Sequence, residues 1–567
     1  MTQRDGDVET PARTAAPTWL PSRTDLLVIG AGINGTAIAR DAALRGLDVV
    51  VVERDDLAAG ASAWNSRLIH GGIRYLEHGE LRLVYESLRE RGLLLRHAPH
   101  LVRPYPLLIP YFRHNTRPGW LLTTGMLLYD LLSPGKTTPR SRVLTRRRLL
   151  RHWPGLRRDG LRGGGLYYDA QVAWPERLSV ENAVAAHQAG ARIHTHVRAE
   201  RLIEDGGRVV GARVVDELTG GSADIAAGAV LNATGANIDA LLPADWSASR
   251  LIGGTKGTHL LVDPFPGAPP TGVHYEAGAD ARALLVLPWN GRYLLGTTDE
   301  FVEGDPADVR TDAEEVAYIL AETNRLLPGA QLSEDDVVLS YVGVRPLPYA
   351  EAAGSSAEVS RDHIVHDHAP QHPGLWSVIG GKLTTHRALA EQTMRMVCRY
   401  LGVPSPRRSS ITSVLGLPGG TTADWPGFCT RYLAATSFAR EHAERLLRTY
   451  GTRVRVLEDL AAARPELRVE VGGILGAEIA NAFENEFART VGDVLLRRTM
   501  AAFCAEDRER LGREVADEAA RLGYIESEQV GAQVESFLNR MGALSPERGS
   551  ARKDERASVV LSAEGDG

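Results

Sequence analysis

The stretch that most constrains the fold runs from Leu26 to Glu53. A short apolar run ends in the glycine-rich turn GAGING at 30–35, a helical stretch follows, and a second apolar run ends at Glu53. This order predicts a strand, a tight turn, a helix and a parallel strand with an acid at its end. Such a unit binds a dinucleotide, because its glycines let the backbone approach a diphosphate and its helix N-terminus offers free N–H groups.

The residues of this unit have separate expected roles. Gly30 permits the tight turn, Gly32 lets the backbone approach the diphosphate, and Gly35 lets the helix pack closely on the strand. Glu53 is placed to bind the ribose hydroxyls, and it disfavours NADP because it would repel the extra phosphate. FAD and NAD both remain open at this point. The alternative is a purely structural βαβ unit.

Length, charge and cysteine content exclude several classes of protein. The chain has 567 residues, too many for one hydrophobic core, so two or three domains are expected. A net charge of −6 argues against general nucleic-acid binding. The three cysteines are widely spaced and form no metal-ligand pattern, so a reducing compartment and no metal site are expected. The sequence contains no apolar run that predicts a secretory signal or a transmembrane helix.

One segment suggests contact with a membrane surface. Residues 104–133 are apolar and aromatic, and residues 136–162 hold ten Lys and Arg side chains against a single acid, Asp159. An apolar surface followed by a basic one is typical of a protein that rests on anionic lipid. The alternative is a partly buried helix followed by a solvated basic surface.

Two further segments carry most of the chemical information. SRLIHGGIRYLEHGE at 66–80 and GGKLTTHRALAE at 380–391 resemble the signatures of FAD-dependent glycerol-3-phosphate dehydrogenases. Shorter matching motifs are KGTH at 256–259, GTTD at 296–299, YVGVRPL at 341–347 and LPGG at 417–420. The resemblance runs from about residue 24 to about residue 540 in consistent order. Two departures are Trp64, in a stretch where the family often has Ser, Thr and Lys, and His386, where it often has Tyr.

The resemblance implies oxidation of sn-glycerol 3-phosphate to dihydroxyacetone phosphate by hydride transfer from C2 to FAD, followed by electron transfer to a membrane quinone. It implies a cytoplasmic protein that is peripheral (monotopic) on the inner, anionic face of the cell membrane. It leaves a homo-oligomer open. The nearest alternative is a soluble glycerol-3-phosphate oxidase that uses oxygen and produces hydrogen peroxide. More distant alternatives are an amine or 2-hydroxy-acid oxidase and a non-enzymatic flavoprotein.

The implied fold is α/β, with a glutathione-reductase-like (Rossmann-type) FAD domain, an antiparallel β-sheet substrate domain and a C-terminal all-helical cap domain. The expected boundaries are a flexible arm at 1–22, an oxidoreductase region at 23–400, a helical domain at 405–542 and a disordered tail at 543–567. Within the oxidoreductase region, the FAD-binding parts are about 23–103, 165–250 and 341–400, and the substrate- or membrane-facing parts are about 104–164 and 251–340.

Two histidines are the candidate bases of this reaction, which must remove a proton from the C2 hydroxyl. His70 precedes the Gly71–Gly72 turn, which lets the backbone approach a planar ring, and His259 ends the KGTH motif. The alternative for His70 is a loop histidine bonded to the backbone. The alternative for His259 is a hydrogen-bonded core residue.

Three cations are candidates for the substrate phosphate and the C2 oxygen. In an extended stretch, Arg74 would lie on the same side of the chain as His70, and a surface ion pair is the alternative. Arg345 stands between an apolar strand and a proline, which would hold it rigidly. Lys382 is expected to begin the last FAD helix and to stabilise negative charge on the flavin or to touch the substrate. The remaining candidate substrate-binding residues are Tyr75, Thr298 and Asp299.

The positions that match the FAD contacts of the family are spread over the whole oxidoreductase region. They are Gly30, Gly32, Ile33, Asn34, Gly35, Glu53, Arg54, Ser62, Ser66, Leu68, His70, Val197, Thr234, Gly235, Gly380, Gly381, Lys382, Leu383 and Thr384. Val197 is expected near the adenine, and the two serines can donate to the diphosphate or to ring atoms.

Overall fold

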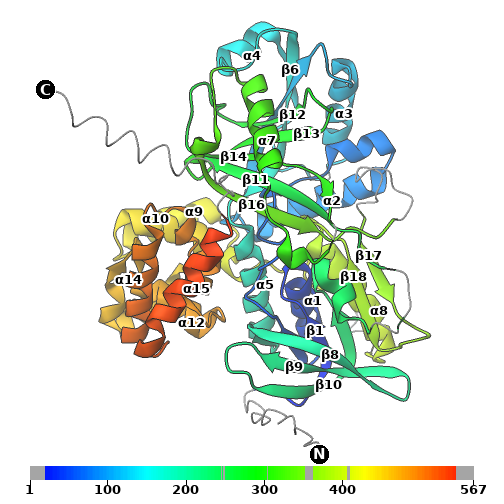
Figure 1. The fold of residues 1–567 in the computed structure, drawn as a ribbon, viewed down its shortest axis with the longest axis vertical. Coiled ribbons are helices and arrows are strands. Elements are labelled where there is room, and N and C mark those ends of the chain that lie inside the picture. Colours follow the sequence, from blue (N-terminus) through cyan, green and yellow to red (C-terminus); the bar gives the residue numbers. More distant parts are fainter. Residues whose placement is uncertain are drawn as a thin grey trace, which may run out of the picture.

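The computed structural model describes residues 20–133, 135–243, 246, 250–302, 304–350, 362–404 and 409–544. Most of the expected N-terminal arm and most of the expected tail lie outside these residues. Two mixed sheets lie one above the other, and a layer of C-terminal helices packs beside them (Figure 1). The predicted α/β class, with a Rossmann-type domain, an antiparallel substrate sheet and a helical C-terminal domain, is confirmed.

The first sheet contains the predicted dinucleotide-binding unit. Its strands are β1 (Arg23–Ile29), β2 (Val49–Val52), β7 (Arg192–His194), β8 (Val197–Asp205), β9 (Arg208–Asp216), β10 (Ser222–Asn232), β17 (Ile364–Asp367) and β18 (Leu375–Ile379). The order across the sheet is β17-β18-β10-β1-β2-β7, and the central strands run parallel. Because both faces of the sheet are covered here, residues 26–29 of β1 and all of β2 are continuous, buried apolar runs.

Helices cover one face of the first sheet and a β-extension covers the other. The helices are α1 (Ile33–Leu44), α5 (Pro175–Gln188) and α8 (His386–Tyr400), which share one apolar core with β1 and β2. Strands β8 and β9 fold over the opposite face and share a second core with the same strands. Helix α1 ends where Gly46 takes a φ of +77°, as the sequence predicts.

The second sheet is antiparallel except where β12 pairs with β4. Its strands are β3 (Leu68–Ile69), β4 (Val102–Phe112), β5 (Arg142–Thr145), β6 (Leu161–Val172), β11 (Thr255–Val262), β12 (Gly272–Glu276), β13 (Ala283–Trp289), β14 (Arg292–Gly296), β15 (Glu300–Phe301) and β16 (Val337–Arg345). Helix α7 (Ala313–Leu326) lies across one face of this sheet (Figure 1). Asp312 and Glu315 form a capping box at the start of α7.

The segment expected to face a membrane forms the strand β4 and then a helix, α3 (Gly119–Leu131), which is followed by α4 (Arg146–His152). Helices α2 (Leu81–His97) and α3 pack near β6, and α3 and α4 lie at the end of the molecule away from α1 (Figure 1). Four large apolar side chains of α3 face solvent: Trp120 is 70% exposed, Leu121 40%, Leu127 60% and Leu131 82%. Within the described ranges, no helix is both long and apolar enough to cross a bilayer.

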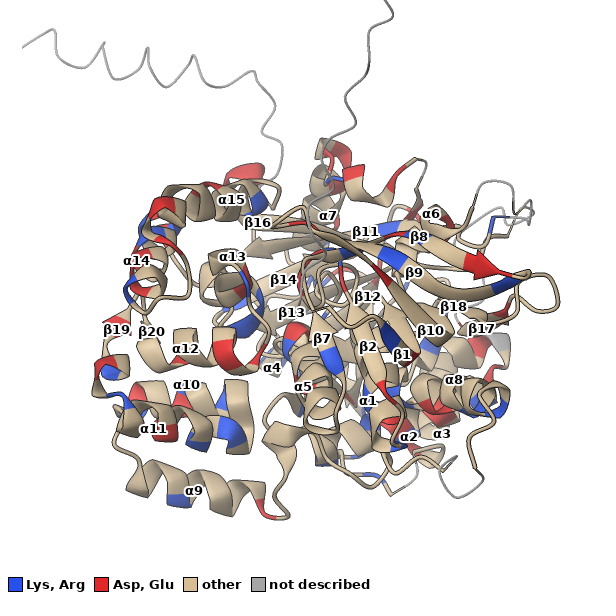
Figure 2. Cartoon of the chain, turned by 90° about the horizontal axis from the view of Figure 1, so that it is seen from below, with Lys and Arg blue, Asp and Glu red and all other residues tan. Residues whose placement is uncertain are grey.

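The C-terminal part is helical, as predicted. Its main elements are α9 (Trp425–Ala435), α10 (Arg440–Tyr450), α11 (Val454–Ala463), α12 (Gly476–Asn485), α13 (Val491–Asp493), the π-helical turn η10 (Val494–Arg498), α14 (Arg508–Arg521) and α15 (Val530–Gly542). Buried ion pairs join this part to the first sheet and its helices, with N–O distances of 2.6 Å for Arg177–Glu486, 2.8 Å for Arg453–Glu181 and 2.6 Å for Arg498–Asp56. Basic and acidic residues gather at this junction beside α5 and β7 (Figure 2).

Candidate cofactor and substrate site

A cavity of about 710 Å³ lies where the two sheets and the C-terminal helices meet. It opens at the carboxyl ends of β1 and β10, because Gly30 follows the first strand and Ala233 follows the second, and both residues line it. The carboxyl edge of a parallel sheet is where α/β proteins bind nucleotides. The cavity therefore begins at the position that the glycine-rich turn predicts.

The turn before α1 is built for a close approach of backbone and ligand. Gly30 has a φ of +105°, and a Cβ there would lie 2.6 Å from the carbonyl oxygen of Ala233. A Cβ on Gly32 would lie 3.1 Å from Oγ of Ser62, on the cavity side. Ile33, the first residue of α1, donates its N–H to Ser62 Oγ at 2.9 Å. The backbone itself thus requires a glycine at position 30, and a side chain on residue 32 would be tight against Ser62 at the cavity wall.

Glu53 reaches back from the end of β2 to the same turn. Its carboxylate accepts hydrogen bonds from the backbone N–H groups of Ala31 at 2.7 Å and Asp55 at 3.0 Å. Burial raises the pKa of Glu53, and the two N–H groups oppose that rise. Glu53 lines the cavity, as expected of an acid at the end of the second strand of such a unit.

The turn at 380–384 closes the cavity from the other side of α1. Gly380 and Gly381 have φ values of +74° and +93°, which glycine adopts without strain. The Asn34 side chain donates to the Gly380 carbonyl at 3.2 Å, while its buried Oδ1 has no hydrogen-bond partner among the described residues. The Thr384 hydroxyl bonds to the backbone of His70 at 3.1 Å and 3.2 Å. Four features together fit FAD: the space left by the glycines, the helix N-terminus, the buried acid Glu53 and the unused amide oxygen of Asn34.

Lys382 lies one turn before the helix that it was expected to begin. Helix α8 begins at His386, because the chain first passes through the two left-handed glycines and a turn. The Lys382 ammonium is buried and lies 4.0 Å from the centroid of the Tyr75 ring. Both residues line the cavity, and this cation–π contact holds the ammonium against its wall.

Several acceptors hold the guanidinium of Arg345 at the end of β16. Its Nη1 donates to Asp299 Oδ1 at 2.9 Å and to the carbonyl of Lys256 at 3.1 Å. Its Nη2 donates to the Thr297 hydroxyl and to the Thr298 carbonyl, each at 3.2 Å. Asp299 and Thr298 do not line the cavity, whereas Arg345 does. The two residues therefore orient the guanidinium from behind.

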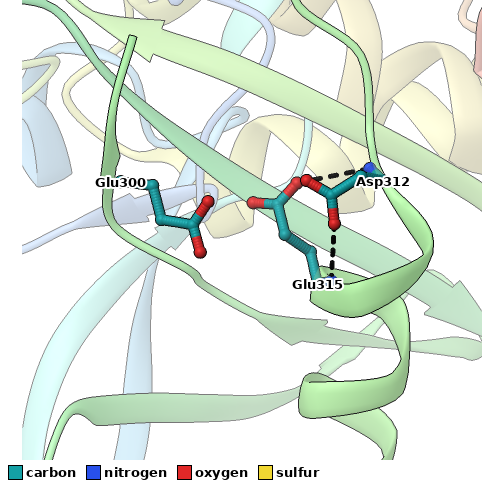
Figure 3. Close-up of side chains that lie close together, drawn as sticks. All are labelled: Glu300, Asp312 and Glu315. Atoms are coloured by element: carbon teal, nitrogen blue, oxygen red, sulfur yellow. Dashed lines mark hydrogen bonds between the residues drawn. The ribbon is translucent and has the colours of Figure 1, made fainter.

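A cluster of carboxylates supports this arrangement. Glu300, Asp312 and Glu315 come together beside β11 and the start of α7 (Figure 3). The ammonium of Lys256 lies between them, 2.6 Å from Asp312, 3.0 Å from Glu315 and 3.6 Å from Glu300. The positive charge offsets the acids, so the cluster forms an ion-pair network behind Arg345.

His259 is buried and neutral. It is 3% exposed, its Nε2 lies 2.8 Å from Oγ of Ser66, and its ring stacks on Tyr341 with centroids 5.0 Å apart. Burial, together with the positive charges of Arg345 and Arg67, lowers the pKa of His259 to about 3. The ring lines the cavity, so it is a neutral hydrogen-bonding group of the site. His70 also lines the cavity and is half-buried.

Most of the predicted site residues line this one cavity. They are Gly30, Gly32, Ile33, Asn34, Glu53, Arg54, Ser62, Ser66, Leu68, His70, Tyr75, Thr234, Gly235, His259, Arg345, Gly380, Gly381, Lys382, Leu383 and Thr384. Gly35 lies outside the lining because it packs under the turn, where a Cβ would be 1.9 Å from the carbonyl oxygen of Gly30. Val197 is buried behind β2, and its N–H donates to the Glu53 carbonyl at 2.7 Å.

The geometry expected for Arg74 is wrong. Residues Ile73–His78 form a short 3-10 helix, η1, and not an extended stretch, because Gly72 and Gly79 at its ends take left-handed conformations. Arg74 is exposed and lies outside the lining of the cavity, whereas the next residue, Tyr75, lies within it. The proposed contact of Arg74 with phosphate now rests on its motif alone.

Sequence reasoning missed the contribution of the C-terminal helices to this cavity. Leu496 and Arg497 of η10, Arg540 of α15, and residues 543–544 line one wall. The last two stand at the start of the expected tail, but the Leu544 carbonyl accepts a hydrogen bond from Ser340 of β16 at 2.8 Å. An arginine pair inside the apolar run VGDVLLRRTMAAF at 491–503 is the signal in the sequence that could have identified this wall.

Family comparisons cover nearly all of the described chain. A family model described as FAD dependent oxidoreductase matches residues 25–393. A second, described as the C-terminal domain of alpha-glycerophosphate oxidase, matches residues 410–528. The chain is 39% identical to a glycerol-3-phosphate dehydrogenase of Synechocystis sp. over 498 residues, which is 85% of this chain and 90% of the relative. It is 36% identical to a D-erythritol 1-phosphate dehydrogenase of Brucella abortus over 84% of this chain and 94% of the relative.

A solved structure agrees with this similarity. The crystal structure of the glycerol-3-phosphate dehydrogenase from Bacillus halodurans complexed with FAD superposes with a TM-score of 0.75 at 28% identity. The match covers 93% of this chain and 96% of that one. The C-terminal helices are therefore part of the shared architecture.

Proposed function

The chain belongs to the family of FAD-dependent glycerol-3-phosphate dehydrogenases, and from this premise we propose that it oxidises sn-glycerol 3-phosphate to dihydroxyacetone phosphate. The observation that carries this proposal is the meeting of Arg345, Lys382, His70 and His259 in the same cavity as the FAD-binding turn. Two cations suit a phosphate and a developing C2 oxyanion, and two imidazoles suit the hydroxyl proton.

The chain's own residues would divide the work as follows. Arg345, held rigidly by Asp299 and two carbonyls, presents a fixed guanidinium to the substrate phosphate or to the C2 oxygen. Lys382 adds a second positive charge to the same cavity. Bound FAD supplies the acceptor for the hydride that leaves C2.

His70 is the better candidate for the base. His259 is neutral, but a pKa of about 3 makes its ring a weak proton acceptor at neutral pH. Its contact with the Ser66 hydroxyl suits a role in fixing the 62–66 loop beside the cofactor. His70 lines the cavity, and its backbone is anchored by Thr384, so its imidazole can meet the C2 hydroxyl from a fixed loop.

We further propose that the electrons pass to a membrane quinone. Support comes from the exposed apolar side chains of α3 and from the basic residues of α4 that follow them, which together suit an anionic bilayer surface. Helix α3 also reaches the site, because the Tyr129 hydroxyl accepts a hydrogen bond from the N–H of Gly71 at 2.7 Å. A protein that lies on the inner face of the cell membrane in this way would have the loop around Gly71 close to lipid.

The alternative acceptor is oxygen. The C-terminal match to alpha-glycerophosphate oxidase is the observation that keeps this second function open. The similarity to a D-erythritol 1-phosphate dehydrogenase likewise keeps a longer polyol phosphate open as substrate.

A substrate and acceptor panel tests these proposals. Flavin bleaching of the purified holoenzyme is measured with glycerol 3-phosphate, D-erythritol 1-phosphate and glycerol, and reoxidation is followed with oxygen or a short-chain quinone. We expect rapid bleaching with glycerol 3-phosphate and faster reoxidation by quinone. Peroxide formation at a rate equal to turnover would assign the oxidase activity instead. Bleaching only with D-erythritol 1-phosphate would reassign the substrate.

A further inference from the structure

Buried arginines in this protein normally face a carboxylate. The N–O distances are 3.3 Å for Arg67–Glu176, 2.6 Å for Arg91–Asp169, 2.6 Å for Arg177–Glu486 and 2.6 Å for Arg498–Asp56. Arg497 differs from its immediate neighbour Arg498. It is 5% exposed, and among the described residues no carboxylate oxygen lies within 4.0 Å of its guanidinium.

The contacts that Arg497 makes leave much of its hydrogen-bonding capacity unused. Its Nη1 donates to the carbonyl of the preceding residue, Leu496, at 3.2 Å, and its buried Nε has no hydrogen-bond partner in the described part of the chain. Its Cζ lies 4.9 Å from the ring centroid of Trp64. Burial lowers the pKa of Arg497, and the more distant carboxylates of Glu176, Asp56 and Asp55 offset that fall only in part. A buried charge with no ion-pair partner lowers the stability of the fold. We therefore expect that Arg497 is kept because it binds a ligand.

The backbone around Arg497 departs from regular helix geometry, as backbones at functional sites often do. The residue lies in the π-helical turn η10, and Met500, just after it, has a left-handed φ of +54°. The Trp64 ring that Arg497 contacts is itself held in place, since its indole N–H donates to the Ala59 carbonyl at 3.1 Å and its ring also contacts Phe503. The indole that departs from the family pattern thus contacts the C-terminal helices.

The position of Arg497 on the cavity wall identifies the anion. Trp64 belongs to the 59–64 turn, which also carries Ser62, the hydrogen-bond partner of the α1 N-terminus. Arg540, the next cation on this wall, pairs with Asp55 at 3.1 Å, two residues beyond the ribose acid Glu53. This is the nucleotide end of the cavity. We propose that Arg497 binds the diphosphate of FAD, so that the C-terminal helices supply a cation to a cofactor held by the first sheet.

The proposal assigns the C-terminal part a role in cofactor retention. The α1 N-terminus offers partial positive charge from one side, and a guanidinium offers a full charge and a planar set of donors from the other. Because the cation comes from the docked C-terminal helices, FAD binding and docking must reinforce each other. The inference depends on FAD as cofactor and holds whichever substrate and electron acceptor the enzyme uses.

Flavin-binding measurements on apoprotein test the proposal. FAD is removed from wild type, Arg497→Met and Arg497→Lys, and dissociation constants for FAD and riboflavin are measured by fluorescence quenching. We expect Arg497→Met to raise the Kd for FAD about ten- to a hundredfold, because a charge-assisted hydrogen bond is lost. Riboflavin has no phosphate, so its Kd should not change. Arg497→Lys should give an intermediate Kd, and it keeps the test open if the Met variant does not fold.

Two further readouts distinguish this role from a structural one. The melting temperature of Arg497→Met apoprotein should equal or exceed that of wild type, since the variant removes an unpaired buried charge. The matched control is Arg508→Gln, which changes a half-buried C-terminal arginine that does not line the cavity. This substitution should leave the dissociation constants for FAD and for riboflavin unchanged. An unchanged Kd for FAD in Arg497→Met, or equal weakening of FAD and riboflavin, would overturn the proposal.

Discussion

Nη1 of Arg345 lies 2.9 Å from Oδ1 of Asp299, a residue 46 positions earlier in the chain. The carboxylate is 23% exposed and does not line the cavity, whereas the guanidinium does. The ion pair therefore sets the direction of a cation in the site without occupying space in it.

Asp299→Asn should lower kcat/KM for glycerol 3-phosphate about tenfold, because the amide holds the guanidinium with a weaker hydrogen bond. The measurement is steady-state kinetics on flavin-saturated enzyme. The matched control is Asp263→Asn, which removes the carboxylate of an exposed pair with Arg292 at 2.8 Å and should change kcat/KM less than twofold. Equal effects of the two substitutions would contradict a positioning role for Asp299.

Arg345→Ala should raise KM for glycerol 3-phosphate about ten- to a hundredfold, the cost of losing a charged hydrogen-bond partner of about 1.5–3 kcal/mol. Lysine should rescue poorly, because it offers no planar fork. Arg74→Ala is the comparison, since Arg74 lies outside the cavity lining and should have the smaller effect. A larger effect at Arg74 would restore that residue as the phosphate ligand. Loss of kcat at constant KM in Arg345→Ala would assign the guanidinium to the C2 oxygen.

Acid should destabilise the protein partly through His259. In the folded protein the ring gains a proton only near pH 3, whereas in the unfolded chain it titrates near 6.5. Between these values the unfolded state binds more protons, so this stability is present above pH 6.5 and is lost as pH falls toward 3. Through this residue, a change from about pH 7.5 to about pH 5 should lower the free energy of unfolding by about 2 kcal/mol. His259→Gln should reduce the pH dependence of the unfolding free energy by that amount, and an unchanged dependence would contradict the lowered pKa.

Two glycine substitutions should separate binding from folding. A Cβ on Gly32 meets only the Ser62 hydroxyl at 3.1 Å, whereas a Cβ on Gly35 would lie 1.9 Å from the Gly30 carbonyl oxygen. Gly32→Val should therefore abolish FAD binding and yield colourless protein with native circular dichroism. Gly35→Ala should lower the melting temperature of the apoprotein itself. Retention of yellow colour by Gly32→Val would contradict the placement of the diphosphate at this turn.

Membrane binding should depend on α3 and α4 together. Leu131→Ser removes an apolar side chain that is 82% exposed, and Arg146→Gln with Arg147→Gln removes two exposed cations. Each change should weaken cosedimentation with vesicles containing phosphatidylglycerol. Loss of the charges should reduce the binding free energy by about 1 kcal/mol per arginine, and the effect should be strongest at low salt. The control is Arg510→Gln with Arg513→Gln on α14, which should have no effect. Failure of the wild-type protein to bind such vesicles would favour the soluble oxidase.

Local patterns predicted the parts of the site that depend on local geometry. The unit from β1 to Glu53 is one continuous segment, so its turn, helix and acid could be placed from residue type and spacing. The 3-10 helix that places Arg74 outside the cavity lining could not be predicted in this way. It depends on left-handed conformations at Gly72 and Gly79 that the motif does not specify. Arg497 lies far along the chain from the glycine-rich turn, and only the docking of the C-terminal helices brings it to the cavity.

The buried charges between α5 and the C-terminal helices also bear on how this family can diverge. Arg177 and Glu486 are 309 residues apart and form one buried network with Glu181 and Arg453, so loss of any one member would leave an unbalanced charge in the interior. A substitution there is best tolerated when a second one restores the balance of charge, so the four positions should covary among related sequences. A descendant that discards its C-terminal helices would lose Glu486 and Arg453 together, one charge of each sign, and would leave Arg177 and Glu181 paired with each other at 3.4 Å.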